Sequence, residues 1–191
     1  MRNTRQTSYP VDPLILGRRS ARAMSGKPLT KEDLMPLFEA ARWAPSSYNH
    51  QPWRFLYALA GSPQWALFFS FLLSNNQVWA SRAGALVTLI SRNRFEKNDK
   101  AARLHSFDAG SAFENLALQG VKNGLVVHPM EGFYEEKARI ALQIPDFYSV
   151  QIMIAIGWPA DPECLPEELR AREVWTKRTP LEELVIEGIY R

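Results

Sequence analysis

The chain has 191 residues, 46% of them hydrophobic and 23% charged, and its formal net charge is +3. This composition is typical of a folded domain and excludes extensive disorder, while acidic residues interleaved among the basic ones disfavour a general nucleic-acid surface. Because there is one cysteine, no signal-peptide core and no apolar run near the roughly 20 residues that span a bilayer, we expect a cytoplasmic protein without disulfides or membrane segments.

The first part of the chain predicts a polar arm and a capped helix. Residues 1–13 are polar, contain two prolines and form the arm that leads into the fold. Thr30 and Asp33 resemble a capping box ahead of an amphipathic helix. Alternatively, Asp33 is the N-cap, which would place Pro36 in the first turn, where proline is tolerated. In either case the helix must end before Pro45.

The remaining elements alternate between short apolar strands and helices. Strands are predicted at residues 54–58, 85–90, 125–128 and 150–158. Helices are predicted from Ser62 to Leu73, from Ser106 or Asp108 to a left-handed cap at Gly124, and from Tyr134 to Gln143. Since no repeat or long linker is present, we expect residues 1–191 to form a single three-layer domain of the α+β or α/β type, with a C-terminal extension at 181–191.

Several common catalytic and binding signatures are missing from the sequence. The chain has no P-loop, no GxGxxG after a strand and no serine in a nucleophile elbow. Its three histidines, His50, His105 and His128, are too scattered to suggest a metal site. NTPase, Rossmann, hydrolase and metalloenzyme interpretations therefore lack support, and we predict neither a catalytic side chain nor a metal ligand.

The segment Gly17–Arg22 is the first that points to chemistry. It carries Arg18, Arg19 and Arg22 together with the hydroxyl of Ser20. Guanidinium groups match the oxygens of a phosphate, so these side chains could converge on one anion. A solvated basic turn is the alternative interpretation.

The segment Ala44–Trp53 is the second. It places hydroxyl and amide side chains between Pro45 and Pro52, two residues that fix the backbone. Such a rigid polar loop suits recognition of the edge of a heteroaromatic ring by hydrogen bonds. An ordinary N-cap and turn cluster is the alternative.

Taken together, the two segments resemble the signature of the nitroreductase family. The chain contains RRSARAM and, downstream, EAARWAPSSYNHQPWRF, with the content and spacing of that family. Further stretches resemble the family in the right order: NNQVWASRAGALV, residues 108–120, GLVVHPMEGF, IAIGWP and TKRTPLEELV. The similarity spans residues 14–188, and PSSYNHQPW is its most specific part.

The resemblance implies a fold, a cofactor and a reaction. The fold would be α+β, a three-layer α/β/α arrangement with a central, mostly antiparallel sheet flanked by helices, in an intertwined homodimer with FMN at the interface. The protein would be an oxidoreductase that transfers hydride from NAD(P)H by way of FMN to an electron-poor acceptor such as a nitroaromatic or a quinone, in ping-pong order, with the chemistry carried by the flavin. A non-catalytic flavin-binding or storage protein of the same fold is the alternative.

The resemblance also implies which residues bind the cofactor. The phosphate and ribityl chain would contact Arg18, Arg19, Ser20 and Arg22, with Arg178 as a second basic contact. The ring would be bonded by Asn76 and approached on its N5 side by the backbone of Glu131 and Gly132. From the partner subunit, the flavin would be closed over by Pro45, Ser46, Ser47, Asn49 and Gln51. The family often has another basic residue two positions before Arg178, where this chain has Thr176 followed by Lys177.

Overall fold

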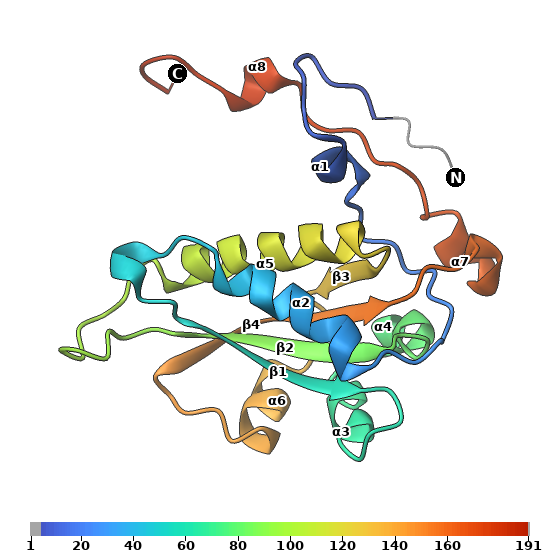
Figure 1. Ribbon diagram of the computed structural model, residues 1–191, viewed down its shortest axis with the longest axis horizontal. Coiled ribbons are helices and arrows are strands. Elements are labelled where there is room, and N and C mark those ends of the chain that lie inside the picture. The colour runs from blue at the N-terminus through green and yellow to red at the C-terminus, as the bar shows by residue number, and fades with distance from the viewer. Residues whose placement is uncertain (1–4, 191) are drawn as a thin grey trace.

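Four apolar segments form the sheet at the centre of the protein (Figure 1). The structure, a computed structural model, describes residues 5–190. The strands are β1 (Trp53–Leu59), β2 (Ala85–Arg92), β3 (Val126–Met130) and β4 (Tyr148–Gly157). Their order is β1-β2-β4-β3, and every neighbouring pair is antiparallel. The central strands β2 and β4 have long buried runs, residues 85–91 and 153–157, which explains why both segments are mostly apolar in the sequence.

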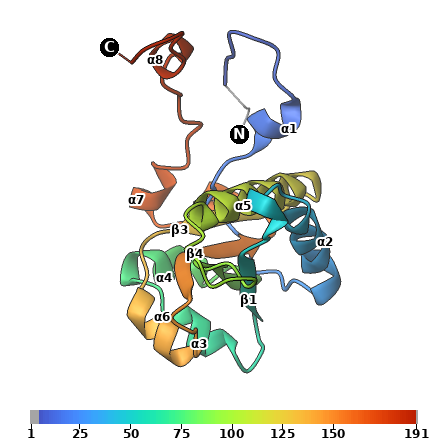
Figure 2. The same cartoon turned by 90° about the vertical axis from the view of Figure 1, so that its left-hand side faces the viewer.

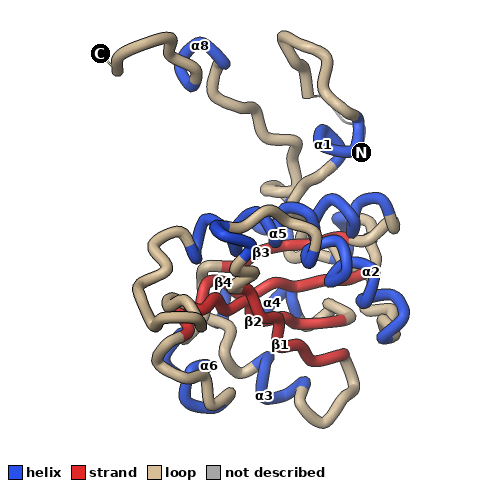
Figure 3. The backbone as a smooth tube through the Cα atoms, turned by 60° about the vertical axis from the view of Figure 1, so that its left-hand side comes forward, coloured by secondary structure: helices blue, strands red, loops and turns tan. Residues whose placement is uncertain are grey.

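Helices cover both faces of this sheet, so the fold has three layers (Figures 1 and 3). One face is covered by α2 (Lys31–Arg42) and α5 (His105–Lys122), and the other by α3 (Trp65–Phe69), α4 (Ser74–Ala80) and α6 (Glu135–Ala141). Neighbouring side chains of a strand point to opposite faces, so Leu86 joins one core and Val87 the other. The predicted three-layer α+β fold with an antiparallel sheet is confirmed.

The helix α2 begins at the capping box that the sequence suggests. The hydroxyl of Thr30 accepts a hydrogen bond from the Asp33 N–H at 3.2 Å, and the Asp33 carboxylate accepts one from the Thr30 N–H at 2.8 Å. The alternative with Asp33 as the N-cap is therefore wrong, and Pro36 lies inside the helix, where it removes one backbone hydrogen bond. Burial of the apolar helix face offsets this loss, and the helix ends before Pro45 as predicted.

The helix α5 makes a close contact with β3. A Cβ atom on Gly120 would lie 2.5 Å from Val127 Cγ2, so only a glycine lets the helix approach the strand to this distance. The helix starts at His105, one residue before the predicted Ser106, and Gly124 follows it with a φ of 75°. The predicted long helix and its left-handed stop are confirmed.

The apolar segment after β1 differs from its prediction. One helix is expected from Ser62 to Leu73, but α3 covers only Trp65–Phe69, and a turn separates it from α4. The α-helical hydrogen bonds stop after Ser70, because the N–H groups of Phe71 and Leu72 donate to carbonyls three residues back. The Leu73 N–H then donates to the carbonyl of Gly132 at 3.2 Å, which brings the start of α4 beside the segment that follows β3.

Both ends of the described chain lead away from the three layers, on the side of α5 (Figures 1 and 2). The N-terminal arm enters α1 (Pro13–Gly17), and the C-terminal segment runs through η2 (Pro162–Cys164), α7 (Glu167–Arg170) and α8 (Leu181–Leu184). The C-terminal tail exposes large apolar side chains, with Tyr190 87% exposed. Residues 1–4 of the predicted arm and residue 191 lie outside the described part. Within residues 5–190, no helix combines the length and apolarity needed to cross a membrane.

Candidate functional site

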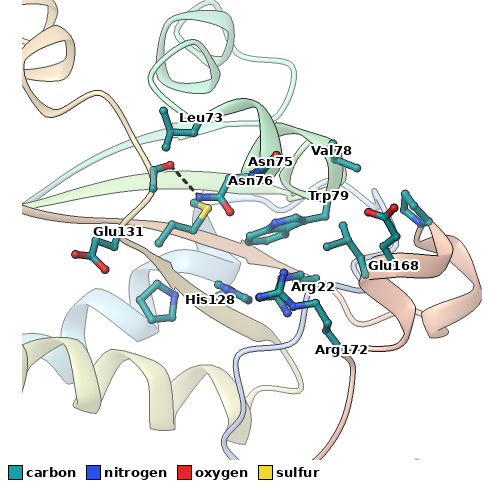
Figure 4. Close-up of a pocket in the computed structure, with 15 residues that line it drawn as sticks. Arg22, Leu73, Asn75, Asn76, Val78, Trp79, His128, Glu131, Glu168 and Arg172 are labelled. Carbon is teal, nitrogen blue, oxygen red and sulfur yellow. Dashed lines mark hydrogen bonds between the residues drawn. The ribbon is translucent and has the colours of Figure 1, made fainter.

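A cleft of about 1080 Å³ opens between α4, the end of β3 and the α7 region. Figure 4 shows side chains from these elements and from the segment after α1 pointing into the same space. Four residues that the sequence analysis assigns to a cofactor line it: Arg22, Asn76, Glu131 and Gly132. Pockets that bury small organic ligands have volumes of about 300–1,000 Å³, so this cleft is large enough for a mononucleotide.

Asn76 and Gly132 form the polar edge of the cleft. Asn76 Nδ2 donates to the Gly132 carbonyl at 2.9 Å, the bond drawn in Figure 4. The same carbonyl accepts from the Leu73 N–H, so two donors fix the backbone after β3. A Cβ on Gly132 would lie 2.9 Å from Asn76 Nδ2, which means that a side chain there would displace the asparagine. The cleft therefore holds an oriented amide beside a close-lying stretch of backbone.

His128 and Trp79 form the inner wall of the cleft. Their rings lie 4.4 Å apart, and His128 Nδ1 donates to the carbonyl of Ala21 at 2.9 Å. Burial lowers the pKa of His128 to about 4, so its imidazole is neutral near pH 7. The hydrogen bond from neutral His128 to Ala21 joins β3 to the segment that carries Arg22 without adding charge. It thereby fixes the backbone from which the Arg22 guanidinium reaches the cleft.

A cluster of arginines, the basic cluster, adjoins the cleft. Its members Arg18, Arg19 and Arg22 have side chains only 19%, 23% and 21% exposed. Arg19 and Arg22 contact the carboxylate of Glu173, which is 1% exposed and accepts from Arg19 NH2 at 3.1 Å and from the Arg22 N–H at 2.9 Å. Arg18 instead lies 3.8 Å from the half-exposed Glu114. One buried negative charge thus faces several positive ones.

The two ends of the chain complete the basic cluster. The guanidinium groups of Arg5 and Arg19 both lie over the ring of Trp175, at 5.0 and 5.3 Å from its centroid. Arg5 NH1 also donates to the carbonyl of Arg18 at 2.6 Å. Burial, followed by the positive charges of Arg178, Arg18 and Arg19, lowers the pKa of Arg5. Because these guanidinium groups repel one another, an added anion would stabilise the cluster.

The loop at residues 45–51 has a strained backbone. Within it, η1 (Ser47–Asn49) contains two left-handed residues, Tyr48 and Asn49, both with a φ of 53°, and Gln51 has a φ of 48°. Such conformations cost non-glycine residues on the order of 1 kcal/mol each. They are held by two anchors: the carboxylate of Asp108, 4% exposed, accepts from the Ser47 N–H at 3.1 Å, and the Ser46 hydroxyl accepts from the Gln51 N–H at 3.0 Å.

This loop and the cleft lie at opposite ends of the molecule. In Figure 1 the loop is at the end away from α4 and α7, and no residue of the loop lines the cleft. Its surroundings expose large apolar side chains, with Trp43 73%, Tyr48 93% and Phe107 73% exposed. Within one copy of the chain the loop cannot close over the cleft.

The predicted residues therefore fall into three groups. The cleft contains Arg22, Asn76, Glu131 and Gly132. Arg18 and Arg19 lie in the basic cluster away from the cleft, beside Ser20, whose hydroxyl accepts from Arg18 NH1 at 3.4 Å, and Arg178, whose charge acts on Arg5. The distant loop contains Pro45, Ser46, Ser47, Asn49 and Gln51. Arg22, which the sequence analysis assigns to the phosphate, is the one that reaches the cleft.

Sequence reasoning missed five residues of this region. They are Arg5, Trp79, His128, Arg172 and Glu173. Trp79 and His128 read as ordinary core residues of a helix and a strand, and Glu173 lies in a mixed-charge stretch where no pattern marks a buried carboxylate. Across residues 5–190, no group of three or more His, Cys, Asp or Glu side chains is arranged to hold a metal ion.

Comparison with known proteins identifies similar chains over most of the length. A family model described as the nitroreductase family matches residues 15–64 and 57–158. A Bacillus subtilis protein named as an NAD(P)H nitroreductase, MhqN, is 26% identical to this chain, with 90% of this chain and 96% of that protein covered.

Solved structures agree with the sequence comparison. A crystal structure described as an oxidoreductase containing FMN is 43% identical, with a TM-score of 0.95, and the match covers 100% of this chain and 98% of that one. A nitroreductase structure from Desulfovibrio desulfuricans, described as a complex with FMN, is 25% identical with a TM-score of 0.73, covering 97% of this chain and 100% of that one.

Proposed function

The chain belongs to the nitroreductase family, and we propose that it is an FMN-dependent oxidoreductase that takes hydride from NAD(P)H and reduces a small electron-poor acceptor. One observation carries the proposal. A basic cluster with surplus positive charge adjoins a cleft lined by amide and backbone groups, and Arg22 belongs to both. A ligand that fills both must combine an anionic end with a polar ring, which is the chemistry of FMN.

The phosphate of FMN would bind in the basic cluster. Donors for it are supplied by Arg18, Arg19, Ser20 and Arg178. Charge-assisted hydrogen bonds from arginine to phosphate are short and about twice as strong as neutral ones. The lowered pKa of Arg5 supports this placement, because the positive charges that lower it would be balanced by the incoming dianion. Lys177 is exposed and could add charge where the family's second C-terminal basic residue is replaced by Thr176.

The ring of FMN would lie in the cleft. Asn76 would bond its polar edge, and the backbone of Glu131 and Gly132 would approach its N5 side. The guanidinium of Arg22 faces the same space, so it would stabilise the negative charge that reduction places on the ring.

The protein's own contribution is binding, orientation and electrostatics. FMN, when bound, would supply the redox chemistry, accepting hydride from NAD(P)H and passing it to the acceptor in a ping-pong cycle. The neutral His128 is buried and bonded to a backbone carbonyl, so it serves as part of the wall. We propose no side chain as an obligatory acid or base.

The site would be complete only in a homodimer. Residues Pro45, Ser46, Ser47, Asn49 and Gln51 would close over the cleft of the other copy, since they lie far from their own. A two-fold axis then creates two equivalent sites. Residues 1–191 would form one domain, and residues 5–13 of its arm and 181–190 of its extension would pack on the partner, which would cover the exposed apolar side chains of the tail.

The first experiment is the visible absorbance spectrum of the purified protein reconstituted with FMN, before and after NADPH or NADH is added under argon. Flavin bands that bleach with either nicotinamide support the proposal. Bands that persist with both would instead favour a flavin-binding or storage protein, and failure to retain FMN would refute the site altogether.

The variant Arg19→Ala tests the phosphate contact. Loss of a hydrogen bond to a charged group typically costs about 1.5–3 kcal/mol, so FMN affinity should fall by at least tenfold. The control Lys31→Ala removes an exposed positive charge at the start of α2, outside the basic cluster, the cleft lining and the loop at residues 45–51, and should keep full occupancy. Equal FMN occupancy in both variants would argue against the assigned role.

A further inference from the structure

Glu173 is the least exposed carboxylate near the cleft. Its side chain is 1% exposed, and glutamates are almost never buried to this degree unless their charge is paired. It comes from the C-terminal segment after α7, between Arg172, which lines the cleft, and Trp175, which carries Arg19 on its ring. The residue is not itself part of the cleft lining.

The two oxygens of this carboxylate contact two different arginines. Oε2 accepts from Arg19 NH2 at 3.1 Å, whereas Oε1 accepts from the Arg22 N–H at 2.9 Å and lies 3.9 Å from Arg22 NH1. Arg19 is thus held between the carboxylate and the Trp175 ring. Arg22 is held at its backbone, so its guanidinium remains directed to the cleft (Figure 4).

Stability alone is a weak reason for this arrangement. A buried ion pair loses much of its Coulomb energy to desolvation, and apolar replacements are often as stable. The carboxylate of Glu173 does fix geometry, because it sets the positions of both Arg19, predicted at the phosphate, and Arg22, which faces the ring. Its negative charge also offsets one unit of the positive charge that Arg22 presents to the ring.

We propose that Glu173 is a positioning residue of the FMN site, which orients Arg19 and Arg22 and moderates the positive charge at the flavin ring. This inference rests on the proposed function. The charge and the reach of the carboxylate have separate consequences. Without the charge, Arg22 stabilises reduced FMN more strongly and the midpoint potential of the flavin rises. With the charge but one methylene less, the carboxylate cannot reach both arginines and FMN binds more weakly.

The test compares wild type, Glu173→Gln, Glu173→Asp and the control Glu167→Gln. Glu167 is an exposed glutamate of α7 outside the cleft lining, so its variant removes the same charge six residues away. Two quantities are measured for each: the FMN dissociation constant by quenching of flavin fluorescence, and the midpoint potential of bound FMN by equilibration with a reference dye.

We expect Glu173→Gln to raise the ratio of reduced to oxidised FMN affinity by on the order of tenfold, which is about 30 mV for a two-electron couple. Glu173→Asp should weaken FMN binding by roughly tenfold, as for the loss of a charged hydrogen bond, and leave the potential unchanged. Glu167→Gln should match wild type in both. A purely structural role for Glu173 would change stability without moving the potential.

Three results would overturn the proposal. The first is a potential in Glu173→Gln equal to that of Glu167→Gln, and the second is wild-type FMN affinity in Glu173→Asp. The third is failure of both Glu173 variants to fold, which would make the residue a stability element. If only the glutamine variant fails to fold, the aspartate variant decides. A wild-type protein that binds no FMN would refute the proposed function itself, a distinct outcome.

Discussion

Substituting Gly132 by alanine would test the polar edge of the cleft with a single methyl group. The new Cβ would lie 2.9 Å from Asn76 Nδ2 and 3.5 Å from Leu73 Cδ1. Gly132 has no left-handed φ, so the backbone accepts alanine and the effect is steric. The asparagine must move, yet it is bonded to the carbonyl of the same residue at 2.9 Å. It therefore cannot keep both its position and its hydrogen bond.

The expected magnitude follows from that one bond. A typical net hydrogen bond contributes about 0.5–1.5 kcal/mol, so displacement of Asn76 should weaken FMN binding by roughly 2- to 13-fold. Thermal stability should change little, because Gly132 is partly exposed in a loop. The assay is a fluorescence titration with FMN beside a thermal melt. Asn76→Ala should give a loss of similar size, and the two changes should not add, since both remove one interaction.

Gly110→Ala is the matched control. Gly110 lies on the exposed side of α5, and its new Cβ would have no atom within 4 Å. This variant should bind FMN as wild type does. If Gly132→Ala binds FMN as tightly as Gly110→Ala, the contact between the asparagine and the glycine does not orient the flavin-binding amide, and the reasoning fails.

Three further predictions concern the loop, the helix contact and pH. Asp108→Ala removes the acceptor that anchors the strained loop at residues 45–51, so the FMN affinity of the dimer should fall by about tenfold while far-UV circular dichroism is unchanged. An unaltered dissociation constant would show that Asp108 does not hold the loop in its FMN-binding conformation. Gly120→Ala should be less stable than Gly110→Ala by about 1–3 kcal/mol in urea unfolding, because both gain the same helix propensity and only the first clashes with β3; equal stabilities would show that the contact relaxes freely. Burial lowers the pKa of His128 to about 4 from an ordinary 6.5, so the unfolded chain binds a proton at this histidine more readily than the folded chain does. The free energy of unfolding should therefore fall as pH falls from 6.5 toward 4, by at most about 3 kcal/mol. Unfolding of wild type and His128→Gln at pH 7 and pH 5 measures this loss, and equal pH dependence in the two proteins would exclude it.

The local elements and the family were readable from the residues alone. The apolar runs of β2 and β4 and the glycine stop at Gly124 each depend on neighbours within a few positions, so their physics is contained in the sequence. The choice between Thr30 and Asp33 as the N-cap of α2 needed the structure, because burial of the helix face offsets the cost of Pro36 inside the helix. The same holds for the two motif segments. Their residue types match phosphate and ring recognition whatever the rest of the fold does.

Contacts between distant segments could be known only from the tertiary structure. The Leu73 N–H, at the residue to which the predicted helix extends, donates to the carbonyl of Gly132, 59 residues later in the chain. Arg22 is adjacent to the other arginines in sequence, yet the bond between His128 and Ala21 holds its segment against β3 and directs it to the cleft. No local pattern carries either interaction.

Glu173 illustrates the physical reason most clearly. In the sequence it is one of many charged residues in a polar C-terminal stretch, where a solvated glutamate is the ordinary expectation. Its burial results from two arginines over 150 residues earlier in the chain, which approach it only after the sheet and both ends of the chain have come together. Local preferences and motif chemistry are properties of short segments, whereas the burial and pairing of a charge depend on the whole fold.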